Sequence, residues 1–363
     1  VGSEMCIRDS IGNYMTDSYG VVSGWVFGND GYMGTAITKR GNKKLTWETT
    51  SEFNIGLDLG FFDNRISLSM EYYNRIISDL LVSNKSLPAY NEINTIAANI
   101  GKTQGRGFEL TLSTVNIMNK DWTWSTDFTF YTFKDNWYER DPNWKPAAYE
   151  SKKDPIRSYY SYVSDGLLQV GEKAPAWQPT LVPGQIKLKN LYDTGTSPNV
   201  LDQYDKVNLG SQDPKCTLGL NNTLRYKNLD FNIYFYGEIG RLRGASYYDA
   251  WIVGLGNSLT NVSQQSLHSY TNANQNTTVP NLIESAYDFG DYYHKKINYL
   301  RCRNITLGYT IPVSKSIANS VRISANVSNP FVFTNWNGVD PETDTGNFSY
   351  PNVTSFSFGI DIS

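Results

Sequence analysis

The sequence predicts an all-β protein of the class of antiparallel transmembrane β-barrels. Three observations lead to this prediction: polar and apolar residues alternate along several segments, the two clearest segments are long, and short connections alternate with long ones. A tilted strand needs about 9 to 11 residues to cross a bilayer, whereas strands of globular proteins usually have about five or six. Outer-membrane barrels join their strands by short turns on one side and longer loops on the other.

The clearest hairpin spans residues 45–77. Between Trp47 and Phe61 the odd positions are mostly apolar and the even positions are polar or glycine. This two-residue period indicates a strand with one apolar face. The pattern resumes after a turn at Asp63 and Asn64. We expect the apolar face of this hairpin to lie in lipid, its polar face to line the lumen and its short turn to lie on the periplasmic side.

Weaker or shorter versions of the same alternation follow along the chain. They predict further strands at residues 108–114, 122–131, 156–168, 184–191, 217–226, 229–236, 300–311, 320–333 and 353–362. With the first hairpin, these segments make about eleven strands. Long polar stretches are predicted as loops at residues 81–104, 134–155, 192–214 and 238–296, and residues 11–44 as loop with one weak strand near residues 20–27.

Composition excludes several other classes of protein. The 363 residues are 40% hydrophobic and 14% aromatic, which supplies one apolar face of a sheet. No run of about 18 apolar residues forms a candidate transmembrane helix. The formal net charge of −3 provides no basic patch, so nucleic acid is not an expected partner. The three cysteines are scattered and indicate neither a disulfide framework nor a zinc site.

Catalytic and metal-binding motifs are missing from the sequence. His268 and His294 are the only histidines, and their surroundings predict polar loop residues. No nucleophile or nucleotide-binding motif occurs, so we expect no enzyme and no cofactor. Four aspartates between residues 193 and 213 could offer oxygen ligands to calcium, but their spacing does not fit a calcium loop. An ordinary solvated loop is the favoured interpretation of this segment, and no metal site is predicted.

Aromatic residues in the predicted loops are the candidate substrate-binding residues. Their flat apolar faces suit stacking against sugar rings or peptide side chains. The candidates are Trp137, Tyr138, Trp144, Tyr247, Tyr248 and Trp251. The alternative for each of them is a place in the aromatic girdle that marks the membrane interface. Trp122 and Trp124 follow a tight turn at the start of a strand and fit a girdle on the periplasmic side.

Several sequence blocks, taken in order, resemble a known family. The blocks are LTWETTSEFNIGLDLGFFDNRISLSMEYYNR from Leu45, NIGKTQGRGFELTLST from Asn99, YLRCRNITLGYT from Tyr299, VSNPFVFTNWNGVDPE from Val327 and FSYPNVTSFSFGIDI from Phe348. In this combination and order they resemble the SusC/RagA-type TonB-dependent transporters of Bacteroidota outer membranes.

The resemblance implies a barrel of 22 strands closed by an N-terminal plug domain. Residues 45–363 would then form the C-terminal half of the barrel, and the plug would be missing from this fragment. Residues 1–10, VGSEMCIRDS, match nothing downstream in character and are expected to be a non-native leader. Half a barrel leaves two open sheet edges, which are unfavourable in lipid.

The resemblance also implies a function and partners. These are TonB-dependent uptake of a glycan, oligosaccharide or peptide nutrient across the outer membrane, a SusD-like surface lipoprotein, and TonB-ExbB-ExbD acting through the missing N-terminal part. Outer-membrane lipid would surround the barrel. The alternative hypothesis is a secreted or surface-attached β-rich protein that binds glycans or mediates adhesion. Strands with apolar residues on both faces would favour that alternative, whereas here the polar face carries Glu48, Glu52 and Asp58.

Overall fold

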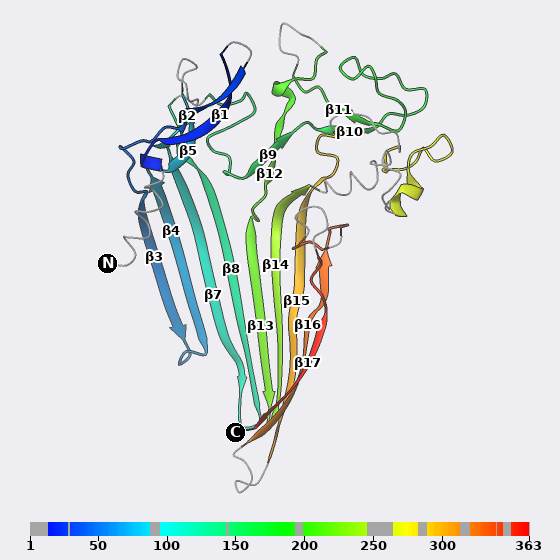
Figure 1. Ribbon diagram of the computed structural model, residues 1–363. Helices are drawn as coiled ribbons and strands as arrows, with labels where there is room; N and C mark the ends of the chain where they lie inside the picture. The colour runs from blue at the N-terminus through cyan, green and yellow to red at the C-terminus, as the bar shows by residue number, and fades with distance from the viewer. Residues whose placement is uncertain are drawn as a thin grey trace. The chain divides into compact units, whose positions relative to one another are not determined.

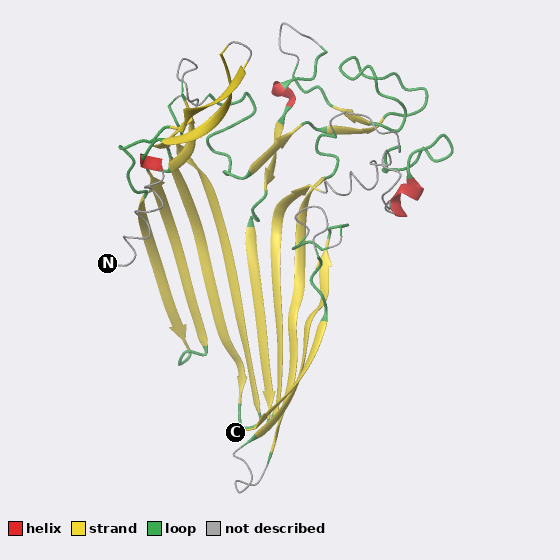
Figure 2. Ribbon diagram, in the orientation of Figure 1, coloured by secondary structure: helices red, strands yellow, loops and turns green. Residues whose placement is uncertain are grey.

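Most of the chain is described by a computed structural model. The described residues are 14–27, 30–87, 95–142, 145–192, 199–244, 264–281, 289–312, 320–338, 340–343 and 350–362. The expected leader at residues 1–10 lies outside them. Figure 2 shows that strands dominate the described chain, as the sequence predicted. Among these residues no helix is long and apolar enough to cross a membrane.

One large antiparallel sheet contains nine strands in the order β17-β16-β15-β14-β13-β8-β7-β4-β3 (Figure 1). Their bounds are β3 Thr49–Phe61, β4 Ile66–Ser78, β7 Lys102–Met118, β8 Trp122–Glu139, β13 Cys216–Tyr226, β14 Leu229–Gly244, β15 His294–Ile311, β16 Val321–Thr334 and β17 Ser355–Ile362. The sheet is not closed, because β3 and β17 are its two edges. The strands that the sequence predicted most clearly all lie in this sheet.

The remaining strands form four two-stranded sheets. They pair β1 Ser18–Phe27 with β2 Asp30–Lys39, β5 Leu81–Ser86 with β6 Thr95–Asn99, β9 Ser158–Ser161 with β12 Val207–Ser211, and β10 Ser164–Leu167 with β11 Ile186–Leu188. Two short 3-10 helices are described, η1 Gln203–Asp205 and η2 Gln264–His268.

Several loop predictions were therefore wrong. Residues 11–44 and 81–104, predicted as loops with at most one weak strand, contain the hairpins β1-β2 and β5-β6, and β7 already begins at Lys102. Residues 192–214 contain η1 and β12. These strands are rich in glycine, serine or asparagine, so the alternation of apolar residues that identifies a strand in a sequence is weak in them.

Besides β7, three further strands of the large sheet are longer than predicted. β8 continues to Glu139 and β14 to Gly244, while β15 begins at His294. Lysine, glutamate and arginine are frequent in these extensions, which is typical of loops in soluble proteins. The predicted strands at residues 156–168 and 184–191 became the short strands β9 to β11 outside the large sheet. The large sheet therefore holds nine of the described strands, whereas about eleven were expected.

The first hairpin was predicted correctly. β3 and β4 meet at a four-residue turn in which Phe62, Asp63 and Asn64 have positive φ angles of 55°, 53° and 62°. Asparagine and aspartate tolerate this left-handed region better than most residues. Large apolar side chains are exposed on this hairpin and on β17, among them Phe53 at 60% and Phe358 at 84%. A bilayer is the environment in which such a face is favourable.

Polar side chains bond to one another across neighbouring strands. The Asn232 amide donates to Asn221 Oδ1 at 2.8 Å and to Thr223 Oγ1 at 3.0 Å. Ser113 Oγ donates to Asp127 Oδ1 at 2.7 Å. Such bonds satisfy polar groups within the wall itself. They fit the expectation of a polar face that lines a lumen.

The chain divides into two compact units. One comprises Val1–Asn54, Tyr73–Arg106 and Asp135–Lys145, and the other comprises Ile55–Tyr72, Gly107–Lys134 and Pro146–Ser363. In the first unit, the buried residues Leu45 and Ala97 pack with Tyr14, Met15 and Leu81. The second unit has two small buried clusters. One consists of Leu167, Ile186, Leu188 and Tyr270, and the other of Ile297 and Trp336. Neither unit has an extended apolar core among its described residues.

Gly308 allows an ion pair to cross strand β15 near its C-terminal end. Arg322 on β16 reaches Asp230 on β14, with 2.6 Å between Arg322 Nη2 and Asp230 Oδ2. Gly308 lies between them in register and pairs with Asp230. A Cβ atom at Gly308 would meet the Arg322 guanidinium and would lie 2.6 Å from the Asp230 carboxylate. Any side chain at this position therefore competes with the ion pair.

We expect the Gly308→Val variant to destabilise the barrel by about 1 to 3 kcal/mol, the usual range for overpacking. The measurement is the temperature at which the folded form disappears in heat-modifiable gel migration. Gly105→Val is the matched control, because a Cβ at Gly105 has no neighbour within 4 Å. Equal losses in the two variants would show that Gly308 has no special role.

Candidate ligand-binding site at the ends of strands β14 and β15

A bulge in β14 determines which side chains face the site. The pairing register between β14 and β15 shifts between Ile239 and Arg241. The extra residue is Gly240, whose φ of 78° favours glycine. Before the bulge Glu238 pairs with Tyr299, and after it Arg241 pairs with Ile297.

The bulge changes the alternation of faces along β14. In a regular strand Glu238 would share its face with residues 240 and 242. Because one residue is inserted, Glu238 instead shares its face with Arg241 and Arg243, opposite Tyr299, Ile297 and Lys295 of β15. Ile239 remains on the other face and is 40% exposed. The end of β14 therefore presents charged side chains where a regular strand would present glycine and leucine.

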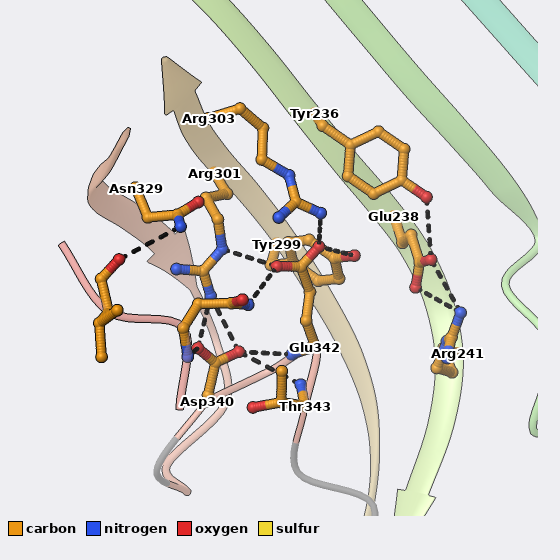
Figure 3. A network of polar contacts seen from close by, with 12 residues as sticks. Tyr236, Glu238, Arg241, Tyr299, Arg301, Arg303, Asn329, Asp340, Glu342 and Thr343 are labelled. Carbon is orange, nitrogen blue, oxygen red and sulfur yellow. Dashed lines mark hydrogen bonds and ion pairs between the residues drawn. The ribbon is translucent and has the colours of Figure 1, made fainter. Parts of the chain in front are cut away.

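A buried network of ion pairs lies on this face (Figure 3). Arg301 of β15, only 3% exposed, places Nη2 2.9 Å from both carboxylate oxygens of Asp340. Its Nε lies 2.8 Å from Glu342 Oε2. Arg303 donates a further hydrogen bond to Glu342. Asp340 and Glu342 belong to the connection between β16 and β17. The network therefore holds this connection against β15.

The two carboxylates also bind groups outside β15. The backbone amides of Glu342 and Asn352 donate to Asp340 at 2.8 and 3.0 Å. Tyr299 Oη donates to Glu342 Oε1 at 3.0 Å. Burial favours the neutral form of Asp340, but the backbone amides and Arg301 outweigh it and hold the pKa of this carboxyl below its usual value.

A second ion pair continues the network along β14. Arg241 Nη2 lies 2.7 Å from Oε2 of Glu238, and Tyr236 Oη donates to Glu238 Oε1 at 3.1 Å. The Arg303 guanidinium lies 5.2 Å above the ring of Tyr236, within the range of a cation–π contact. Arg243 Nη2 donates to the backbone oxygen of Glu342 at 2.9 Å. Arg241 is therefore held by Glu238 of the same strand, and Arg243 by the β16-β17 connection.

A cavity of about 300 Å³ opens beside these arginines. It is lined by Arg157, Tyr159, Gln212, Arg241, Leu242, Arg243, Gly244 and His294. These residues come from β14, from the first residue of β15, and from the segments around β9 and β12. No acidic residue is among the described residues that line it.

Contacts at the cavity wall fix several of these side chains. Arg157 Nη1 lies 2.7 Å from Asp213 Oδ1, and its Nη2 donates to Gln212 Oε1 at 3.3 Å. The rings of Tyr159 and His294 stack with centroids 4.4 Å apart. A Cβ atom at Gly244 would lie 2.7 Å from Nε2 of His294. Glycine at this position therefore leaves space for the imidazole.

The aromatic candidates from the sequence do not line this cavity in the described part of the chain. Trp137 and Tyr138 lie near the end of β8, where the guanidinium of Arg140 lies 5.3 Å above the Trp137 ring and Tyr138 is 56% exposed. The other four candidates, Trp144, Tyr247, Tyr248 and Trp251, lie outside the described residues.

The acidic segment has roles within the fold. Asp205 is fully buried and accepts hydrogen bonds from the backbone amides of Leu191 and Tyr192 at 2.6 and 3.0 Å. Asp202 caps η1, and Asp213 pairs with Arg157. The expectation of an ordinary solvated loop was therefore wrong for Asp205. Asp193 lies outside the described residues. Within the described ranges no cluster of three metal-binding side chains occurs.

Sequence reasoning missed Arg241, Arg243 and His294 as site residues. All three were placed in a predicted loop of nearly sixty residues, at residues 238–296. The dense charge in residues 238–243, EIGRLR, is the signal that could have identified a polar strand end rather than a loop.

The sequence matches the family model described as TonB dependent receptor-like, beta-barrel, over residues 10–329. The TonB-dependent receptor P3 of Formosa agariphila is 29% identical over 93% of this chain and 36% of its own length. The receptor SusC of Bacteroides thetaiotaomicron is 28% identical over 92% of this chain and 34% of its own length. The chain thus spans about a third of the length of these relatives.

Solved structures of a peptide transporter share the fold. A structure of the RagAB peptide transporter superposes with a TM-score of 0.73 at 24% identity, covering 96% of this chain and 39% of the other. The RagAB peptide importer in its open-open state gives a TM-score of 0.74 at 22% identity, covering 97% and 38%. At these identities the likeness concerns the fold alone.

We expect Asp340→Asn to release residues 340–343 from β15. Breaking one side of a buried ion pair costs about 3 to 5 kcal/mol, and the low end applies here because Glu342 still pairs with Arg301. Because the pKa of Asp340 is lowered, the wild-type contact is complete above about pH 4 and is lost only as the pH falls through the lowered value.

Hydrogen exchange of residues 340–343 and 350–353, read by mass spectrometry at pH 7, measures this release. Asp165→Asn is the control, since Asp165 lies 3.6 Å from Lys189 in an exposed pair. Unchanged protection in Asp340→Asn would mean that the network does not anchor the connection.

Proposed function

Because the chain belongs to the family of TonB-dependent receptor β-barrels, we propose that the intact protein actively imports a nutrient across the outer membrane. The chain is an outer-membrane β-barrel protein, and its family consists of receptors and transporters rather than enzymes. The single observation that carries the proposal is the family match, which extends over most of the chain. The long antiparallel strands with exposed apolar side chains support it. In this proposal residues 45–363 contribute to the barrel wall and its loops.

The proposed nutrient is a glycan, an oligosaccharide or a peptide. Likeness to the SusC receptor and to the fold of the RagAB peptide transporter supports this range of substrates. The substrate-binding candidates remain the loop aromatics Trp137, Tyr138, Trp144, Tyr247, Tyr248 and Trp251, to which the structure adds the cavity beside Arg241. No observation favours the alternative of a secreted adhesive protein.

The proposed partners are a SusD-like surface lipoprotein and the TonB-ExbB-ExbD complex. Likeness to SusC supports the lipoprotein, and membership in a family of TonB-dependent receptors supports the energy coupling. Part of the energy from TonB would be used to open a plug in the intact protein.

Deletion of tonB is expected to abolish growth on the nutrient and its accumulation in cells. Uptake of labelled nutrient is measured in the parent and in the deletion strain. A solute small enough to diffuse through general porins is the control and should enter both strains equally. Unchanged uptake of the nutrient in the deletion strain would contradict active transport.

Affinity purification of the tagged full-length protein from detergent extracts is expected to recover a surface lipoprotein in a fixed ratio. Mass spectrometry identifies it, and an unrelated tagged barrel of the same strain is the control. Recovery of the receptor without any lipoprotein, in extracts that keep other outer-membrane complexes intact, would contradict the proposed partnership.

A further inference from the structure

We propose that the cavity between β14 and the β9-β12 segments binds the acidic group of an oligosaccharide, carboxylate or sulfate. This inference rests on the proposed function of nutrient uptake and names the chemical class of substrate. The cavity lining includes Arg157, Arg241, Arg243 and the imidazole of His294, with no acidic residue among the described lining residues. Guanidinium groups bind planar and tetrahedral oxyanions through paired N–H donors. The lining therefore offers guanidinium donors of the kind that bind oxyanions.

The arginines are held in place before a ligand arrives. Glu238, which is 7% exposed, fixes Arg241 through contacts of 2.7 and 2.8 Å. Asp213 and Gln212 fix Arg157, and the backbone oxygen of Glu342 accepts from Arg243. Holding the arginines in a fixed geometry lowers the entropy lost on binding. A guanidinium has five N–H donors, so a contact through one or two of them does not exhaust its capacity.

One donor of Arg241 has no acceptor in the described structure. The Nε atom of Arg241 is buried and has no hydrogen-bond acceptor among the described residues. A buried donor without an acceptor is unfavourable by about 1 to 3 kcal/mol, and native structures contain few of them. Arg241 lines the cavity, but this nitrogen is enclosed by protein atoms, so an oxyanion bound there reaches it only after the guanidinium shifts.

The rest of the lining favours a sugar over an apolar peptide side chain. Leu242 is the only aliphatic side chain among the described lining residues, whereas Gln212 and Tyr159 offer polar groups to hydroxyls. The ring of Tyr159 adds a flat surface of the kind that packs against a sugar. The volume of about 300 Å³ is at the lower end for ligand pockets. It suits a short acidic end or branch rather than a long chain.

The test is equilibrium binding to the purified full-length protein in detergent, which needs neither TonB nor a partner. Short oligogalacturonides are compared with their neutral methyl esters, and sulfated with unsulfated galacto-oligosaccharides. We expect at least one acidic form to bind about tenfold or more tightly than its neutral counterpart, equivalent to about 1.4 kcal/mol. The paired series distinguish carboxylate from sulfate as the preferred group.

Variants then assign the effect to the cavity. Arg241→Gln is expected to weaken acidic binding about tenfold and to leave the neutral counterpart unchanged. Arg157→Gln, on an exposed side chain, is the second variant if the first fails to fold. Lys189→Gln removes a cation that does not line the cavity and should have no effect. Heat-modifiable migration confirms folding of each variant.

Equal affinity for acidic and neutral sugars would overturn the inference, as would acidic binding that survives both arginine variants. Acidic peptides that bind through the same arginines more tightly than acidic sugars would also overturn the substrate class. Because binding is measured without energy coupling, loss of TonB-dependent uptake and loss of acid recognition are separate results. Either one can fail alone.

Discussion

The burial of Arg301 imposes a constraint on the structure around it, where the last residues of β14 lie beside the first residues of β15. A guanidinium that is 3% exposed requires carboxylate partners, because an unpaired buried charge is strongly unfavourable. Those partners, Asp340 and Glu342, lie about forty residues along the chain in the connection between β16 and β17. Their engagement places a segment of that connection against the wall and brings Glu342 to Tyr299, Arg303 and Arg243. Of the arginines beside the cavity, Arg243 is therefore positioned indirectly by this buried cation, because it bonds to the backbone of Glu342.

The sequence predicted the parts of the fold that depend on local alternation. β3, β4, β13 and β17 were recognised because their apolar residues occur at every second position over a whole strand. The sequence predicted β1 only as a weak strand near residues 20–27, and it did not predict the charged and glycine-containing last residues of β14 as part of a strand. In a soluble protein such residues would lie in loops. In a barrel wall the backbone hydrogen bonds of neighbouring strands hold such residues in the sheet. Those hydrogen bonds cannot be predicted from the alternation of side chains.

The candidate site was missed for a related reason. Residue type suggested the loop aromatics as ligand-binding residues, because tryptophan and tyrosine stand out individually. A cluster of arginines from two distant segments has no signature as a cluster in a linear sequence. The formal net charge of −3 gave no indication of this cluster, because a local excess of cationic side chains can occur in a chain with a negative net charge. Only the pairing of β14 with β15, and the packing of residues 157–159 and 212 near them, brings these side chains together.

Gly240 has a consequence for reading related sequences. The face of β14 that carries Glu238 is formed by even-numbered residues before this single inserted residue and by odd-numbered residues after it. A substitution at residue 241 and one at residue 239 are therefore not equivalent, although both numbers are odd: residue 241 shares the face of Glu238, and residue 239 lies on the opposite face. In a relative that lacks the inserted residue, the sequence Arg-Leu-Arg would place leucine on the face of Glu238 and both arginines on the opposite face. Arginines at these positions of a relative therefore indicate the same site only if the inserted residue before them is also present.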